Sequence, residues 1–193
     1  MDINSKSNKL FYLAKGVTLI ELIASITIIS ILASLTIPRA NHFLNNTELN
    51  SSRIFYKKIV QLARAEAVSN ASYGIMCHSI HGQLCTDSKD WNRYILVFAD
   101  LNNNQQLDST EKLAYKHKIP EKSKVHVALS RSKPLIFNET GAVLLNMTLS
   151  ICMQKSGAAI IVSRSGRVRT IMDKNGDSKS DTGTDKMKCH YDN

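Results

Sequence analysis

The chain has 193 residues, which is enough for one or two domains of ordinary size. Hydrophobic residues make up 43% and charged residues 21%, so the composition is not that of a disordered chain, and 8 Gly and 3 Pro exclude collagen-like and Pro-rich classes. Lys and Arg outnumber Asp and Glu by 25 to 16, and this formal net charge of +9 favours an anionic partner such as nucleic acid or a membrane surface.

The first feature along the chain is an apolar run at residues 17–37, whose one charged residue is Glu21. A helix of about 20 apolar residues crosses a bilayer, and the lysines before the run predict that the start stays in the cytoplasm. A secretory signal would have a shorter apolar run with a small-residue cleavage site after it. A plain signal-anchor is the alternative by composition. However, a carboxylate inside a membrane-spanning run costs free energy, and such a residue usually has a function.

The helix is expected to continue beyond this run, to about residue 69, with a break or kink at Pro38. Apolar residues recur at mostly helical spacing among polar ones in residues 38–69. We expect this exported half to lay the apolar face on a sheet. The predicted face consists of Phe43, Leu44, Ile54, Phe55, Ile59, Leu62 and Ala63.

From residue 73 onward the pattern is typical of strands, which are short, rich in β-branched residues and separated by Gly, Asn, Asp and Pro. No helical run of ten residues separates them, so an antiparallel sheet is favoured over a parallel one. The predicted fold class is therefore α+β, with a β-rich domain over residues 70–193. The predicted strands are 73–79, 93–100, 124–130, 134–138, 144–152, 158–164 and 167–172.

Four cysteines in an exported domain indicate disulfides, and four cysteines allow three connectivities. Cys77 and Cys85 are eight residues apart and could staple a hairpin, which would leave Cys152 to join Cys189 near the C-terminus. Zinc is disfavoured because close ligand pairs are missing. No triad spacing, nucleophile elbow or phosphate loop is present, so we predict no metal, no cofactor and no enzymatic activity.

Residues 100–111 place oxygen-bearing side chains at the ligand positions of an EF-hand loop, but the sixth position, normally Gly, is Gln105. The alternative is an Asx-rich turn whose side chains bond their own backbone. The acidic stretch at residues 173–181 has the same ambiguity. The sequence leaves calcium binding open at both places.

The positive charge is segregated along the chain. Residues 112–133 carry a net charge of +6 and residues 153–172 a net charge of +4, whereas the remainder after residue 16 is net −3. Such segregation is typical of nucleic-acid binders, although a solvated outer strand face is the alternative. In the second segment, strand alternation puts Arg167 and Arg169 on one face, ~6.5–7 Å apart. The sequence does not say whether residues 112–133 join the same surface.

The N-terminal motif at residues 15–22, KGVTLIEL, resembles the class III signal of type IV pilins and pseudopilins. This resemblance implies that a prepilin peptidase removes the leader, residues 1–16, by cleaving between Gly16 and Val17 and that Val17 is then methylated on its amine. Val17 replaces the usual Phe. Glu21 and Pro38 match the family's Glu and Pro positions, and Glu21 is the expected assembly residue, paired with the new amine.

The exported part resembles the FimT/GspH branch of that family. The resemblance rests on a cysteine pair near the first strands, an Asp/Asn turn at residues 98–104, and a Gly-Arg-x-Arg hairpin at residues 166–169. It implies the type IV pilin fold, in which a long N-terminal helix packs on an antiparallel sheet.

The hairpin is most similar to that of FimT-type minor pilins, which bind DNA for uptake in natural transformation. The resemblance implies that Arg167 and Arg169 grip phosphates at the turn made by Gly166, with Arg164 and Lys155 as helpers by nearness in sequence. The expected partners are DNA, other pilins, the prepilin peptidase and the bacterial inner membrane. The expected location is that membrane, with the C-terminal domain in the periplasm, and then a surface pilus. Two alternatives stay open: a structural minor pilin that primes assembly, and a type II secretion pseudopilin of the GspH kind.

Overall fold

The computed structural model describes residues 16–121, 123, 125–153, 156–173 and 189, and for residues 35–43, 45 and 90 it describes the backbone only. The chain divides into two compact units, residues 1–42 and 43–193, and each is described by itself. Almost all of the expected leader, Lys155, and the acidic stretch after Asp173 lie outside the described residues.

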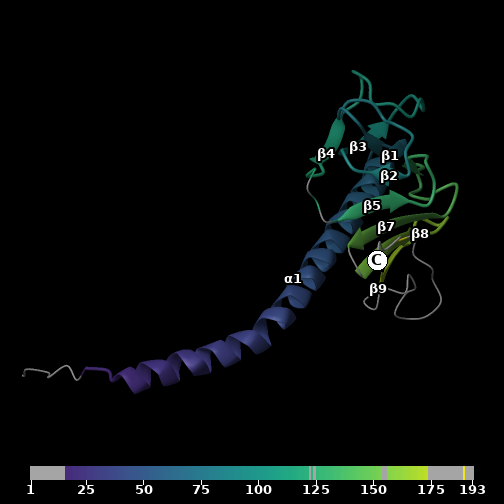
Figure 1. Ribbon diagram of the computed structural model, residues 1–193. Coiled ribbons are helices and arrows are strands. Elements are labelled where there is room, and N and C mark those ends of the chain that lie inside the picture. The colour runs from purple at the N-terminus through teal and green to yellow at the C-terminus, as the bar shows by residue number, and fades with distance from the viewer. Residues whose placement is uncertain (1–15, 122, 124, 154–155, 174–188, 190–193) are drawn as a thin grey trace, which may run out of the picture. The chain divides into compact units, whose positions relative to one another are not determined.

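Helix α1, Leu19–Ser69, begins at a capped N-terminus in the first unit (Figure 1). The Glu21 backbone N–H donates to Thr18 Oγ1 at 3.3 Å, and the Leu22 N–H donates to the Thr18 carbonyl oxygen at 3.1 Å. Thr18 is therefore the N-cap residue, and Glu21 in the first turn suits the positive end of the helix dipole. The helix continues through residue 38, where the sequence predicts a break or kink.

The helix in this first unit has an apolar surface that is exposed among the described residues. The described isoleucines and leucines range from 44% exposed at Ile23 to 75% at Leu19. Among the described residues, no helix has both the length and the apolar content that a membrane crossing requires.

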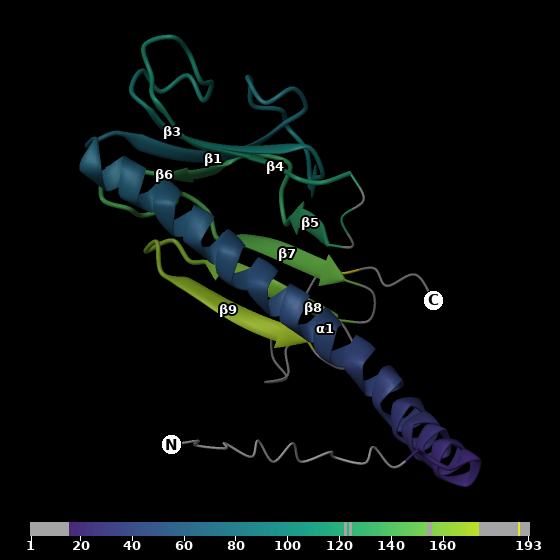
Figure 2. The same cartoon turned by 90° about the vertical axis from the view of Figure 1, so that its left-hand side faces the viewer.

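In the second unit the helix buries a narrow stripe against the sheets (Figure 2). The predicted stripe is partly wrong: Leu44 and Ile54 are exposed, whereas Tyr56 is buried. Small side chains near the end of the helix allow close packing on the sheets. The buried stripe consists of Leu49, Tyr56, Ile59, Val60, Ala63 and Ala67.

The strands form two antiparallel sheets, which agrees with the predicted α+β class. The four-stranded sheet has the order β4-β3-β1-β6, with bounds β4 Leu113–Lys118, β3 Tyr94–Asp100, β1 Tyr73–Ser79 and β6 Leu135–Phe137. The five-stranded sheet has the order β2-β5-β7-β8-β9, with bounds β2 Asp90–Trp91, β5 His126–Leu129, β7 Met147–Met153, β8 Ser156–Val162 and β9 Val168–Asp173. The sequence pattern does not predict β2 or β4.

The main core lies between α1 and the inner faces of both sheets. The central strands β1 and β3 are buried on both faces, because a second cluster of Ile75, Cys77, Leu96 and Phe98 packs under the loop that carries Leu107. In the five-stranded sheet the alternation is simpler, and β9 is its last strand. One face of β9 packs on the core through Val168 and Met172.

Each sheet carries one disulfide. Cys77 on β1 is joined to Cys85, with 5.6 Å between their Cα atoms, and Cys152 on β7 is joined to Cys189, with 5.5 Å. Of the three possible connectivities, the structure has the one in which the close pair forms a short staple. The second bridge ties the C-terminal segment to the middle strand of the five-stranded sheet.

Candidate nucleic-acid interface

The β8–β9 hairpin displays the two arginines of the Gly-Arg-x-Arg motif. Arg167 and Arg169 are exposed, whereas Val168 between them is half-buried and packs on the core. This is the expected strand alternation, and it separates the two residues along the strand by ~6.5–7 Å. Arg169 lies directly opposite Ile161 of β8, so its side chain leaves the outer face of the five-stranded sheet. Arg167 directly precedes β9, and the exposed, half-buried, exposed pattern of residues 167–169 is consistent with the predicted alternation.

The turn of this hairpin is held by hydrogen bonds within residues 163–167. The Ser163 N–H donates to the Arg167 carbonyl oxygen at 3.1 Å, and the Gly166 N–H donates to the Ser163 carbonyl oxygen at 2.8 Å. The Ser163 hydroxyl also donates to the Arg167 carbonyl oxygen at 3.3 Å. These bonds fix the backbone that carries the Arg167 side chain. Less conformational entropy is therefore lost when that side chain binds a ligand.

Gly166, which the sequence analysis places at the turn of the expected DNA-binding hairpin, shapes that turn but has no exposed surface of its own. It is buried, its φ is +74°, and a Cβ there would overlap the carbonyl group of Gly141. The turn therefore does not project freely. It lies against the turn of residues 138–142, where the Arg64 Nε donates to the Gly141 carbonyl oxygen at 3.0 Å.

Arg164 lies in the same turn as Arg167 and is exposed. Its backbone N–H donates to Asn146 Oδ1 at 2.9 Å, and its carbonyl oxygen accepts from the Val143 N–H at 2.9 Å. The structure therefore brings Arg164, Arg167 and Arg169 together at one end of the five-stranded sheet. Lys155, the fourth expected cation, lies outside the described residues.

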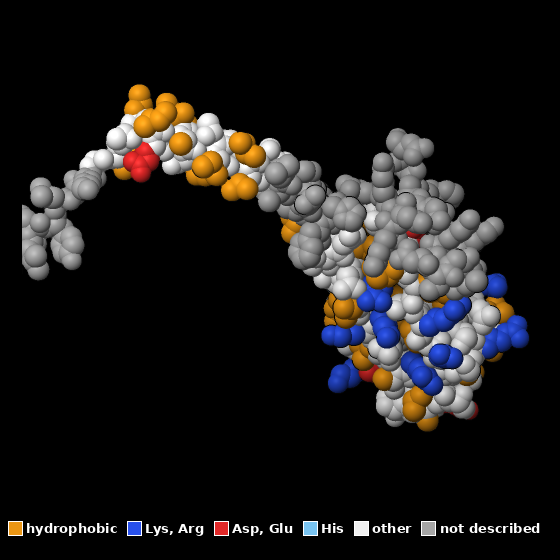
Figure 3. All heavy atoms as spheres, turned by 90° about the horizontal axis from the view of Figure 1, so that it is seen from below, with side chains coloured by type: hydrophobic (Ala, Val, Ile, Leu, Met, Phe, Trp, Pro, Cys, Tyr) orange, Lys and Arg blue, Asp and Glu red, His pale blue; other side chains and the backbone are white. Residues whose placement is uncertain are grey.

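Helix α1 adds further cations to this surface, and their position there is not predicted from the sequence. The Arg53 Nη1 donates to Thr170 Oγ1 on β9 at 3.0 Å, and a groove of about 230 Å³ lies beside this contact. Its lining includes Lys57 and Lys58. The i, i+4 spacing of Arg53 and Lys57 is the sequence signal that could have placed both on one helix face. Seen from below, the coloured part of the second unit shows many Lys and Arg side chains and few acidic ones (Figure 3).

The described part of the other basic segment, residues 112–133, lies on other strands. It includes β4, the first strand of the four-stranded sheet, and β5, which β7 and β8 separate from β9. Several of its cations already have partners. Lys116 Nζ lies 5.2 Å from the centre of the Tyr94 ring, and Lys133 forms a 2.6 Å salt bridge with Asp87.

In the loop at residues 100–111, carboxylates accept hydrogen bonds from the backbone N–H groups of the loop itself. Asp100 is buried and accepts the N–H groups of Asn104 and Gln105, at 3.2 and 2.9 Å. Glu111 accepts the Leu101 N–H at 2.8 Å. These are the side-chain-to-backbone bonds of an Asx-rich turn. In the part of the chain that the structure describes, no group of three His, Cys, Asp or Glu residues is placed to hold a metal ion.

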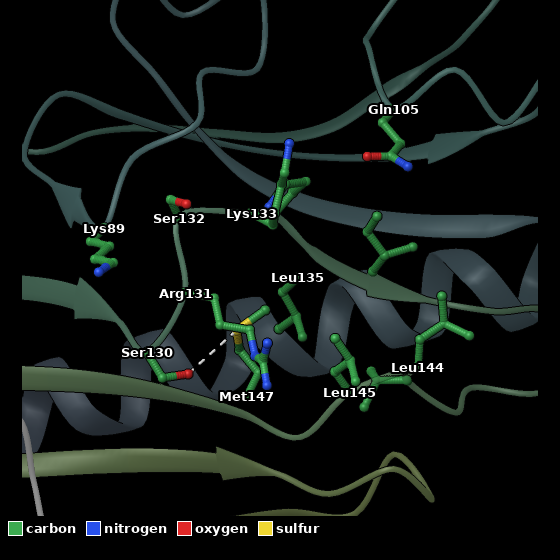
Figure 4. A pocket seen from close by; sticks show the side chains of 13 residues that line it. Lys89, Gln105, Ser130, Arg131, Ser132, Lys133, Leu135, Leu144, Leu145 and Met147 are labelled. Carbon is green, nitrogen blue, oxygen red and sulfur yellow. Dashed lines mark hydrogen bonds between the residues drawn. The ribbon is translucent and has the colours of Figure 1, made fainter.

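A larger groove of about 650 Å³ opens beside the β5–β6 connection (Figure 4). Its rim carries Lys89, Arg131 and Lys133, and its apolar lining includes Leu144 and Leu145, whose exposed fractions are 78% and 47%. None of the described residues that line it is acidic, although Asp87 binds Lys133 nearby. A contact surface with this combination suits a partner that presents apolar and negatively charged groups.

The N-terminal motif residues lie in the first unit. Val17 is 71% exposed, and a Cβ at Gly16 would meet no atom within 4 Å, so the local backbone does not itself require glycine there. The hydroxyls along the apolar helix bond its own carbonyls: Ser25 to Glu21 at 2.7 Å, Thr27 to Ala24 at 2.8 Å, Ser30 to Ile26 at 2.7 Å and Ser34 to Ile31 at 2.8 Å. These bonds satisfy the four hydroxyl donors within the helix itself.

A helix laid on antiparallel sheets, with a separate apolar N-terminal segment, defines the type IV pilin fold. Residues 58–166 match the family described as Type II transport protein GspH. The match spans more than half of the chain, and the chain therefore belongs to the GspH family. No curated protein sequence matches the chain.

Two crystal structures of a minor pilin have the same fold, and a pseudopilin is more distantly similar. The type IV minor pilin FimU of Pseudomonas aeruginosa has a TM-score of 0.52 at 20% identity, over 66% of this chain and 90% of that one. A second crystal form of FimU gives 0.50 at 19% identity, over 70% of this chain and 98% of that one. The minor pseudopilin EpsH of the Vibrio cholerae type 2 secretion system gives 0.46 at 14% identity, over 64% and 96%.

Proposed function

We propose that the protein is a minor pilin that joins a type IV pilus and binds extracellular DNA for uptake in natural transformation. The observation that carries this proposal is the pair Arg167 and Arg169, both exposed at the start of β9, with Arg164 in the adjoining turn. A guanidinium presents a planar fork of N–H donors that matches phosphate oxygens. The spacing of the pair along the strand is close to the spacing of phosphates along one DNA strand.

This binding is independent of base sequence, because phosphates carry no sequence information. It weakens as salt rises, since each neutralised phosphate releases condensed counterions. Aromatic residues are only 6% of the chain, which disfavours base stacking as the main source of affinity.

The N-terminal segment anchors the protein in the inner membrane before assembly and packs in the filament afterwards. The apolar run supports this role, because its exposed side chains need a covering and its hydroxyls are satisfied internally. Prepilin peptidase cleaves after Gly16, Val17 is methylated, and Glu21 then pairs with the new ammonium group. The C-terminal domain faces the periplasm until the subunit enters the pilus.

The deciding experiment measures binding of a fluorescent duplex to the full-length protein in detergent by anisotropy. The double variant R167Q/R169Q should lose about 100-fold in affinity, because charge-assisted hydrogen bonds contribute about 1.5–3 kcal/mol each. The matched control is K112Q/K118Q, which removes two exposed charges at β4 and should change affinity less than twofold. Equal affinity of R167Q/R169Q and wild type would overturn the assignment, provided that both unfold at the same temperature.

A second function rests on the groove beside the β5–β6 connection. A structural minor pilin, or a secretion pseudopilin, needs a surface for a neighbouring subunit, and the exposed Leu144 and Leu145 in that groove provide one. Under this alternative, L144S/L145S abolishes filament assembly in cells while wild-type protein fails to bind DNA. If wild type binds DNA and L144S/L145S still assembles, the alternative is wrong.

A further inference from the structure

The groove between helix α1 and strand β9 combines positive charge with a fixed shape. It is lined by Arg53, Ile54, Lys57, Lys58, Gln61 and Thr170, and it holds about 230 Å³. Three of these six side chains are cationic and none is acidic. A groove of this volume can hold a phosphate group together with bound water.

The Arg53 guanidinium is held in place by neutral acceptors. Its Nη2 and Nε donate to Asn50 Oδ1 at 2.6 and 3.2 Å, and its Nη1 donates to Thr170 Oγ1 at 3.0 Å. These contacts use three of its five N–H donors, so two are left to bind a ligand. The salt bridges in the described part of the chain do not include Arg53, Lys57 or Lys58.

Packing alone does not account for this arrangement. Arg53 and Lys57 are four residues apart on one helix face, and like charges at that spacing destabilise a helix by about 0.2–0.5 kcal/mol. Asn50 orients the guanidinium but removes none of its charge. An anionic ligand would supply the missing charge.

We propose that this groove is a phosphate-binding subsite that continues the DNA surface of the β8–β9 hairpin onto helix α1. The inference rests on the proposed DNA binding and names further residues for it. Thr170 faces the groove, and its neighbour Arg169 faces the outer side of the same strand. Because β9 is the last strand of its sheet, a polyanion that passes around its edge meets both sets of cations.

The test compares salt dependence of duplex binding for full-length protein in detergent. The variant K57Q/K58Q should lower the slope of log affinity against log salt by about 1.8, since each phosphate contact contributes about 0.9. Between 50 and 200 mM salt, wild type should therefore lose about 12-fold more affinity than K57Q/K58Q does. The control K112Q/K118Q removes the same charge elsewhere and should keep the wild-type slope within about 0.3.

A second variant, R53K, keeps the charge but loses the fork that binds Asn50 and Thr170. It should weaken binding about threefold to tenfold while keeping the slope, because one planar donor pair is lost but no counterion contact. If wild type binds DNA and K57Q/K58Q keeps the wild-type slope, the subsite is wrong and the hairpin function stands. If K112Q/K118Q lowers the slope as much, only net charge matters and the subsite is also wrong. If wild type does not bind DNA at all, the proposed function itself fails.

Discussion

The two basic segments of the chain carry similar charge but lie in different settings. Residues 153–172 end the five-stranded sheet, where Arg167 and Arg169 are exposed and a cationic groove of the helix lies on the other side of the strand. Residues 112–133 begin at the edge of the four-stranded sheet, where Lys116 lies over Tyr94 and Lys133 binds Asp87. The comparison teaches that charge along a sequence does not show how the fold groups that charge. The grouping depends on which elements lie side by side, since helix α1 adds Lys57 and Lys58 next to Thr170 of β9.

The disulfides of the two sheets close loops of different length. This difference gives the largest expected effect on the free energy of unfolding. Cys152–Cys189 spans 37 residues and Cys77–Cys85 spans 8, so loop-closure entropy assigns them about 4 and about 2.5 kcal/mol of the free energy of unfolding. In C77A/C85A, a reductant breaks only the long bridge, and in C152A/C189A it breaks only the short one.

The measurement is urea unfolding of each variant, oxidised and reduced, so that packing is the same within each pair. The C77A/C85A variant should lose more stability on reduction than C152A/C189A, by about 1.4 kcal/mol. An equal loss, or a larger loss from the short bridge, would show that the loop lengths do not set the difference between the sheets.

A smaller effect is expected at two turns that both require a left-handed backbone. Gly166, in the hairpin of the five-stranded sheet, has a φ of +74°, and Gly82, beside the four-stranded sheet, has a φ of +75°. Alanine at either position has the same backbone strain, about 1–2 kcal/mol. At Gly82 the new Cβ meets the flexible end of Lys116, but at Gly166 it meets the backbone of Gly141.

G166A should therefore lower the free energy of unfolding by at least about 1 kcal/mol more than G82A, because a backbone clash cannot be relieved by a side-chain rotation. Chemical denaturation of the two variants measures the difference. G166A should also weaken DNA binding, since it displaces the turn that positions Arg167. Equal stabilities of the two variants would mean that the turns at residues 138–142 and 163–167 are not packed tightly together.

The sequence predicts the parts of this fold that depend on local pattern. Apolar alternation and β-branched residues place β1, β3 and β5 through β9, and the shared face of Arg167 and Arg169 follows from the period of a strand. β4 escapes prediction because its sequence, LAYKHK, has no β-branched residue and alternates polar cations with half-buried rings. β2 has only two residues, Asp90 and Trp91, which is too short for any pattern.

The candidate site is less predictable because it depends on contacts between distant segments. Arg53 and Thr170 are 117 residues apart, and nothing local to either residue indicates that they meet. In the same way, the sequence shows that Gly166 makes a bend but not that Gly141 packs against it. The motif therefore predicts the two exposed arginines, whereas the helix groove becomes visible only in the folded structure.

The smallest expected effect concerns pH and again separates the sheets. His78 on β1 is 4% exposed, and its ring lies 6.5 Å from that of Trp91. Burial lowers the pKa of His78, and the neighbouring Asn92 side chain offsets only part of that effect. Burial likewise lowers the pKa of His117 on β4, whose ring is 4.6 Å from that of Phe55. Both acid-sensitive groups therefore belong to the four-stranded sheet.

The folded protein keeps His78 neutral below the pH at which the unfolded chain takes up a proton, about 6.5. The unfolded state then binds more protons, so the free energy of unfolding falls as pH drops below about 6.5 toward the lowered pKa. H78F should reduce the shift in urea midpoint between pH 7.5 and 5.5, whereas the control H126Q, at an exposed position of the five-stranded sheet, should leave it unchanged. DNA affinity of folded wild type should hardly change over the same range, because the proposed binding depends on guanidinium groups and on no histidine. If H78F kept the full shift, His78 would not be the source of acid sensitivity. If DNA affinity instead fell with pH together with the free energy of unfolding, the two sheets would not act as separate regions.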